Sequence, residues 1–75
     1  MSTATYNGWA NYATWNVSLW IQNEYNIYKV ARQYDSYDRL LPRLQRLMGD
    51  TTPDGISWSD KSLDHEELDE MLTDL

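Results

Sequence analysis

Apolar residues recur at helical spacing along most of this chain, and the richest stretch predicts a helix over residues 12–23. Tyr12, Trp15 and Leu19 share one face of this helix at about 100° per residue. Asn11 stands before it as an N-cap, because its side-chain oxygen can accept a backbone N–H of the first turn. The narrow polar strip consists of Thr14, Ser18 and Gln22. A helix that is apolar over so wide an arc is expected at the centre of a core.

A second, amphipathic helix is predicted over about 25–35, after a weak break at 23–26. Its apolar stripe is Ile27, Val30, Ala31 and Tyr34, with the i, i+3, i+4, i+7 spacing of a surface helix.

A third helix follows Ser36 as its cap and ends at Gly49, a residue suited to a helix C-terminus. Its stripe is Tyr37, Leu40, Leu41, Leu44, Leu47 and Met48. Pro42 interrupts this pattern, and two interpretations are open. Either it kinks one continuous helix, at a cost of about 3 kcal/mol, or the helix proper begins near Leu41 with Pro42 in its first turn. We prefer the second, with a turn of helix before it.

The last helix, over 64–75, has the clearest start signal in the chain. Asp64 as N-cap and Glu67 three residues later form an acidic variant of the capping box. The apolar stripe is Leu68, Met71, Leu72 and Leu75, and the opposite face is wholly acidic. The preceding loop, 49–60, contains the turn tripeptide Pro53-Asp54-Gly55.

These elements predict one all-α domain over 1–75, a bundle of three to four short helices around the helix that carries Trp15, Leu19 and Trp20. We expect Trp58 to cover one side and residues 1–6 to be disordered. The chain has no cysteine, so no disulfide can support so small a core. No apolar run approaches the ~18 residues of a membrane span, so we expect no membrane contact and a cytoplasmic location by default.

The net charge of −6 is unevenly distributed. Residues 1–48 carry five basic groups against three acidic ones, whereas residues 49–75 carry nine acidic groups against Lys61 alone. An acidic segment of this density repels nucleic acid and membrane surfaces and favours a partner with a basic surface.

The sequence offers little for catalysis. His65 is the only histidine, lies among acidic residues and is interpreted as solvated. The carboxylates around it lack the spacing of a calcium loop. We therefore predict a protein that is not an enzyme, with no catalytic residue, no cofactor and no metal site.

The surface residues predicted to bind a partner are acidic or tryptophan side chains. They are Glu66, Asp69, Glu70 and Asp74 on the last helix, Asp60 before it, and Trp9 and Trp58, for which core and interface both stay open. Tryptophan is a favoured interface anchor.

A rival interpretation is a nucleic-acid-binding module. Arg39, Arg43 and Arg46 fall on one side of the third helix. The interleaved tyrosines, which offer stacking platforms, are Tyr25, Tyr28, Tyr34 and Tyr37. The simpler interpretation is that the arginines are solvated or pair with the acidic helix. The net charge of −6 makes nucleic acid the less favoured partner.

The string NGWANYATWNVSLWIQN resembles a group of small proteins encoded largely by bacteriophages and mobile elements. The matching residues are Asn7, Gly8, Trp9, Asn11, Tyr12, Thr14, Trp15, Asn16, Val17, Leu19 and Trp20, and Asp54-Gly55, Ser57-Trp58 and 68–71 look similar too. The resemblance implies a phage setting in an infected or lysogenic bacterium, and it carries no activity to any residue.

From these observations we expect a non-enzymatic protein that binds a host or phage protein. In its sharpest form, the acidic face imitates a phosphate backbone and inhibits a host nucleic-acid enzyme or defence system. The alternatives are the nucleic-acid module above and a homo-oligomeric structural protein, the latter because the central helix is more apolar than so small a chain can cover.

Overall fold

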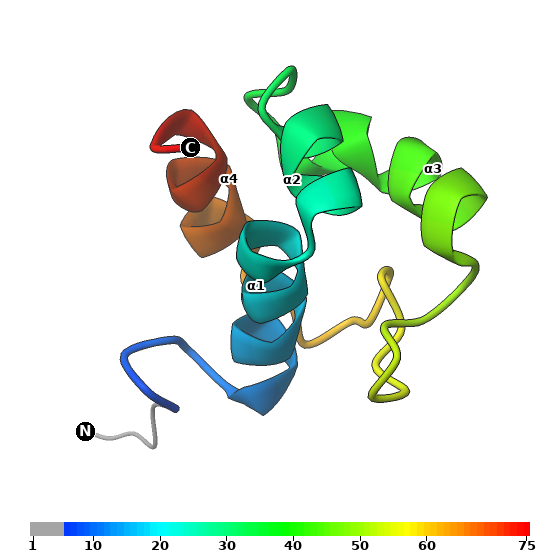
Figure 1. Ribbon diagram of the computed structural model, residues 1–75. Coiled ribbons are helices and arrows are strands. Elements are labelled where there is room, and N and C mark those ends of the chain that lie inside the picture. The colour runs from blue at the N-terminus through cyan, green and yellow to red at the C-terminus, as the bar shows by residue number, and fades with distance from the viewer. Residues whose placement is uncertain (1–5) are drawn as a thin grey trace.

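The computed structural model describes residues 6–75, which form four helices and no sheet. The helices are α1 (Tyr12–Asn23), α2 (Tyr25–Ala31), α3 (Tyr37–Met48) and α4 (His65–Thr73). Figure 1 shows α1 in the middle, with α4 on one side of it and α2 and α3 on the other. The helices pack in a ring, because α1 contacts α2 and α4 while α3 contacts both α2 and α4. The all-α prediction is confirmed. Of residues 1–6, for which disorder was expected, 1–5 lie outside the described part of the chain, whereas Tyr6 pairs with Trp9 in an isolated antiparallel bridge.

Helix α1 begins at the predicted cap. The Asn11 side-chain oxygen accepts hydrogen bonds from the Thr14 N–H at 2.8 Å and the Thr14 hydroxyl at 2.7 Å. The Asn11 amide donates to the Ser62 carbonyl at 2.6 Å, and the Thr14 hydroxyl accepts the Asp64 N–H at 3.0 Å. The start of α1 is therefore tied to the segment that leads into α4.

The buried face of α1 differs from the predicted one. Thr14 and Ser18, assigned to the polar strip, are buried at 0% and 1% exposure, whereas Tyr12 is 43% exposed. Trp15, Leu19 and Trp20 are only half-buried. The prediction failed because it ranked side chains by bulk. Small hydroxyl side chains are readily buried when their polar atoms are bonded; the Ser18 hydroxyl, for example, donates to the Trp15 carbonyl at 2.8 Å. The rest of this inward face is Ala13, Asn16, Val17 and Ile21.

Helix α2 is shorter than predicted and follows α1 after a single residue. The Glu24 N–H donates to the Trp20 carbonyl, and the Glu24 carbonyl accepts from the Ile27 and Tyr28 N–H groups. One residue thus ends one helix and begins the next. Ile27, Val30 and Ala31 are buried, as their spacing predicts.

Helix α3 runs without a break through Pro42, so the preferred start near Leu41 is wrong. Pro42 is exposed and leaves only the Asp38 carbonyl without its i+4 donor. The first turn is held by burial of Tyr37 and Leu40 at 0% exposure. The N-cap residue is Ser36, as predicted. Ser36 makes no side-chain cap bond, and Asp69 of α4 instead accepts the Tyr37 N–H at 2.6 Å.

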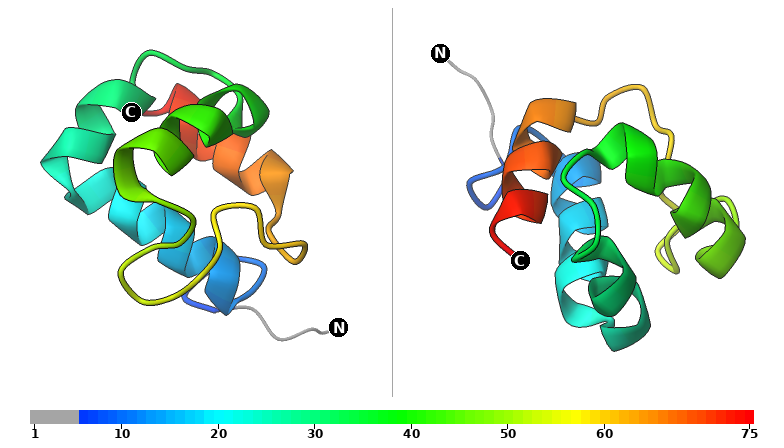
Figure 2. Two further views of the ribbon diagram at one scale, coloured as in Figure 1. Left: turned by 90° about the vertical axis from the view of Figure 1, so that its right-hand side faces the viewer. Right: turned by 90° about the horizontal axis from the view of Figure 1, so that it is seen from above.

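The segment between α3 and α4 packs Trp58 into the core. Figure 2 shows this segment, in yellow and orange, passing α1 on its way from the end of α3 to the start of α4. A single antiparallel bridge joins Thr51 to Ser57. Trp58 is the largest fully buried side chain, and its carbonyl accepts the Tyr37 hydroxyl at 2.6 Å. Burial raises the pKa of Tyr37 far above its ordinary value, so this hydroxyl stays protonated.

Helix α4 starts at Asp64 as predicted, but the capping box is incomplete. The Asp64 carboxylate accepts the Glu67 N–H at 3.0 Å. The Glu67 carboxylate does not return the bond to Asp64 and instead accepts the Ala10 N–H at 2.8 Å. Leu68, Met71 and Leu72 face the core. Among residues 6–75, no helix is long and apolar enough to cross a membrane.

Candidate functional site

A tight turn before α1 fixes the position of Trp9. Asn7 and Gly8 have φ values of 50° and 88°, the left-handed conformations of a two-residue hairpin turn. The turn is closed by two backbone hydrogen bonds between Tyr6 and Trp9, at 2.7 and 2.8 Å. The next N–H, that of Ala10, is held by Glu67. The backbone at Trp9 is therefore anchored by the turn and by Glu67, and the indole packs half-buried against the core.

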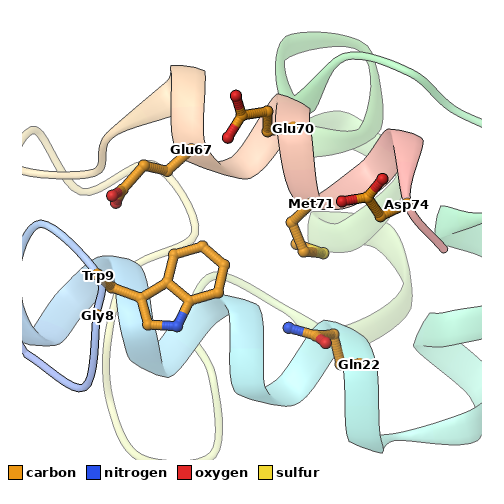
Figure 3. A pocket seen from close by; sticks show the side chains of 7 residues that line it. All are labelled: Gly8, Trp9, Gln22, Glu67, Glu70, Met71 and Asp74. Atoms are coloured by element: carbon orange, nitrogen blue, oxygen red, sulfur yellow. The ribbon is translucent and has the colours of Figure 1, made fainter.

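A pocket of about 340 Å³ lies beside this indole, between the turn, α1 and α4. Its lining consists of Gly8, Trp9, Gln22, Glu67, Glu70, Met71 and Asp74. Figure 3 shows the Trp9 ring between the two helices, with Gln22 on the side of α1 and Glu70, Met71 and Asp74 on the side of α4. The pocket thus combines an aromatic ring and a thioether with a row of carboxylates.

Two of these carboxylates, Glu70 and Asp74, make no contact that stabilises the fold. Both residues are exposed, and within residues 6–75 neither side chain has an ion pair or a hydrogen bond. The last turn of α4 contains no basic residue. Negative charge near a helix C-terminus opposes the helix dipole, and like charges four residues apart repel. These two acidic side chains are therefore unfavourable for the helix that carries them.

This arrangement suits a cation on an apolar stem. An indole face attracts an ammonium or guanidinium group, and carboxylates bind the same group by charge-assisted hydrogen bonds. Metal binding is a poorer fit, because no group of three or more potential ligands in the described residues is arranged to hold an ion.

The pocket contains three of the seven predicted binding residues, namely Trp9, Glu70 and Asp74. Glu66 is exposed on α4 outside the pocket. Asp69 caps α3, and Asp60 accepts the Ser62 N–H at 2.8 Å and the Ser62 hydroxyl at 2.6 Å. These bonds lower the pKa of Asp60.

Trp58 is buried completely, so of its two open roles, core and interface, the structure assigns it the core. The pocket residues that sequence reasoning missed are Gly8, Gln22, Glu67 and Met71. The i, i+3, i+7 spacing of Glu67, Glu70 and Asp74 was the signal that could have grouped the acids.

The Asp54 carboxylate lies outside the pocket and stabilises the fold. One of its oxygens accepts the Asn16 amide at 2.8 Å and the Trp20 indole N–H at 3.0 Å. These two bonds lower the pKa of Asp54, the Asn16 bond most. The buried Thr52 hydroxyl donates to the Asn16 oxygen at 2.8 Å. The cluster fixes the turn at Gly55 against α1, so the polar residues of the N-terminal string act as structural anchors.

A model of a family of unknown function, DUF7249, matches residues 2–75 of the chain. The chain belongs to this family. The match covers nearly the whole chain and agrees with the expected membership of an uncharacterised group, but it attaches no role to any residue. No curated protein and no solved structure matches the chain.

Of the four tyrosines assigned to a stacking platform for nucleic acid, Tyr25 alone is strongly exposed in this DUF7249 member, at 70%. Tyr37 is buried, and Tyr34 packs half-buried against the core. Tyr25 and Tyr28 lie under the cations of Lys29 and Arg32, at 5.4 and 5.6 Å from the ring centres. The exposed arginines of α3 are Arg39, Arg43 and Arg46.

Within residues 6–75, the Nδ1 atom of His65 lies 3.0 Å from a carboxylate oxygen of Asp38, and no arginine of α3 pairs with an acid of α4. The His65 ring also meets the edge of Tyr37. His65 is exposed, as the sequence indicated, and its ring also makes these two contacts.

Proposed function

We propose that this protein is a non-enzymatic binding protein that docks a basic surface of a protein partner on α4 and the pocket beside Trp9. The observation that carries the proposal is the pair of exposed carboxylates, Glu70 and Asp74, next to a fixed indole. They weaken their own helix and bond to nothing in the described fold. Residues that reduce stability in this way are common at functional sites.

The proposal includes a phage or phage-derived origin and action in the cytoplasm of an infected or lysogenic bacterium. The support is the resemblance of residues 7–23 to small phage proteins. The absence of a second histidine or any cysteine from the sequence supports a binding role over catalysis.

A finer form of the proposal is mimicry of a nucleic-acid backbone. Glu66, Glu70 and Asp74 form an exposed stripe with one carboxylate per turn, about 6 Å apart along the helix axis. A row of regularly spaced negative charges is what a basic nucleic-acid groove binds. The stripe is shorter than the sequence indicated, because Asp69 is turned toward α3. The partner proposed in this form is a nucleic-acid enzyme of the host or a defence protein.

The test is affinity capture from a lysate of the bacterial host with three baits. These are the natural protein, the double variant Glu70→Gln/Asp74→Asn, and Asp35→Asn as a control at an exposed acid outside both α4 and the pocket. We expect one basic protein to be retained by the natural protein and the control and lost by the double variant. Release of that protein by added duplex DNA supports the mimicry form. Capture that is unchanged in the double variant contradicts the proposal.

A second candidate function, self-association, is favoured by the outer face of α1. Tyr6 and Tyr12, exposed at 40% and 43%, form an aromatic cluster with Trp15, with ring centres 4.9 to 5.6 Å apart. Helix α1 contains no charged residue, so this face is where two copies of a chain with net charge −6 approach with the least repulsion. Sedimentation equilibrium decides: a dimer that Trp15→Ser dissociates supports this function, and a monomer at high concentration removes it.

A further inference from the structure

We propose that the pocket beside Trp9 is a receptor for one arginine side chain of the partner. This inference rests on the proposed function and names the chemistry of its central contact. It identifies the group that enters the pocket, whereas the proposed function concerns only the sign of the charge on the partner's surface.

The shape of the pocket favours a planar cation. The Asn7-Gly8 turn fixes the Trp9 backbone and the indole packs against the core, so the ring offers a flat surface at a small further ordering cost. A guanidinium group stacks on such a ring, and its stem contacts the apolar Met71 side chain. An ammonium group lacks the flat face, and this difference makes arginine preferable to lysine.

The carboxylates are placed to bind a group with several donors. Glu70 and Asp74 are one turn apart on α4, and both line the same pocket as Trp9. A guanidinium has five N–H donors in a fixed plane and can meet two acceptors at once. Gln22 adds an amide on the opposite wall. Glu67 contributes charge with one oxygen already held by the Ala10 N–H.

Other ligand classes fit less well. Anions are repelled by three carboxylates, which are the acidic members of the lining. A neutral apolar ligand leaves Glu70 and Asp74 dehydrated without a partner, and burying a charge in that way is costly. The lining therefore selects a positively charged group, and stacking on Trp9 favours a planar one.

The test is a nuclear magnetic resonance titration of the whole protein with N-acetylarginine amide. The matched probe is N-acetylcitrulline amide, which has nearly the same shape without the charge, and N-acetyllysine amide is a third probe. We expect saturable shifts of the Trp9 ring and Gln22 side-chain signals with the arginine compound. The dissociation constant should be on the order of millimolar, since only one side chain binds. Citrulline should cause no saturable shift, and lysine should bind more weakly than arginine.

Four variants, two at acidic residues and two at Trp9, complete the test. Glu70→Gln/Asp74→Asn should weaken arginine binding by roughly tenfold or more, and Asp35→Asn, at an exposed acid outside the pocket, should leave it nearly unchanged. Trp9→Phe keeps an aromatic face, whereas Trp9→Leu removes it. Both should retain the core contact, but Trp9→Leu should bind the arginine compound more weakly than Trp9→Phe.

Equal shifts with arginine and citrulline, or tighter binding of lysine, overturn the arginine assignment. If the titration fails while the double variant still loses its partner in the capture experiment, only this inference is wrong. If both experiments fail, the proposed function is wrong as well.

Discussion

The eight acidic residues of 51–75 fall into two groups that differ in what they bond. The internally bonded carboxylates are Asp54, Asp60, Asp64, Glu67 and Asp69, and each accepts a hydrogen bond from another residue of the fold. The outward carboxylates are Glu66, Glu70 and Asp74, which are exposed and, within residues 6–75, form no such bond. The bonded group fixes loops and helix starts, and through Glu67 and Asp69 it joins α4 to the rest of the fold, whereas the outward group adds negative charge along α4.

The acidic residues of one surface therefore have different roles. Asp69 and Glu70 are neighbours in sequence, yet Asp69 caps α3 while Glu70 lines the pocket. Neutralising the first group should destabilise the fold. Neutralising the outward group, at Glu70 and Asp74, should affect binding instead.

The largest expected effect concerns Asn16, the anchor of Asp54. Asn16 is 1% exposed, donates to Asp54 and accepts from Thr52. Asn16→Ala leaves the buried Thr52 hydroxyl without its acceptor, and we expect a loss of about 2–3 kcal/mol in the free energy of unfolding. Urea denaturation measures it, with Asn23→Ala on the exposed end of α1 as the control. A loss no larger than that of the control removes Asn16 as an anchor.

A smaller loss is expected for Asp69→Ala. The Tyr37 N–H loses a charged acceptor at 2.6 Å, which is worth about 1.5–3 kcal/mol, and alanine returns some helix propensity. We therefore expect a net loss of about 1 kcal/mol by urea denaturation. Asp69→Asn, which keeps a neutral acceptor, should lose less than Asp69→Ala. The reverse order contradicts a capping role.

Lowering the pH should reduce the stability of the fold, because Asp54 and Asp60 become protonated. Hydrogen bonds lower the pKa of each below the ordinary value of 3.8. A carboxyl with a lowered folded pKa contributes its stability above the unfolded pKa and loses it as the pH falls through the folded one. Thermal unfolding between about pH 5 and 2 should therefore show a declining midpoint, with a shallower decline in Asp54→Asn. An equal slope in the variant contradicts the role given to Asp54.

Much of the fold was readable from local patterns. The caps at Asn11 and Asp64 were correct because capping depends on residues within one turn. The stop at Gly49 was also correct, since its φ of 86° is a conformation that glycine adopts readily. The all-α class followed from periodicity alone.

The errors arose where distant residues decide the outcome. Thr14 is buried because it bonds to Asn11 and to the N–H of Asp64, fifty positions away. The helix continues through Pro42 because Tyr37 in its first turn is buried in the core, and the strength of that packing cannot be predicted from periodicity. The pocket needs Trp9 and α4 to meet, which the Ala10 to Glu67 bond achieves across 57 positions. Local pattern therefore found Trp9, Glu70 and Asp74 as surface residues without showing that they share a cavity.

The central claim is that Glu70 and Asp74 serve binding rather than folding, and the most direct test is the stability of Glu70→Gln/Asp74→Asn. Removing like-charge pairs and negative charge near the C-terminus of α4 should raise the free energy of unfolding by a few tenths of a kcal/mol. Urea denaturation at low salt measures this change, with Asp69→Ala unfolded in parallel as the destabilised reference. A double variant as stable as the natural protein or more so agrees with the account. A loss comparable to that of Asp69→Ala would show that these carboxylates stabilise the fold and contradict it.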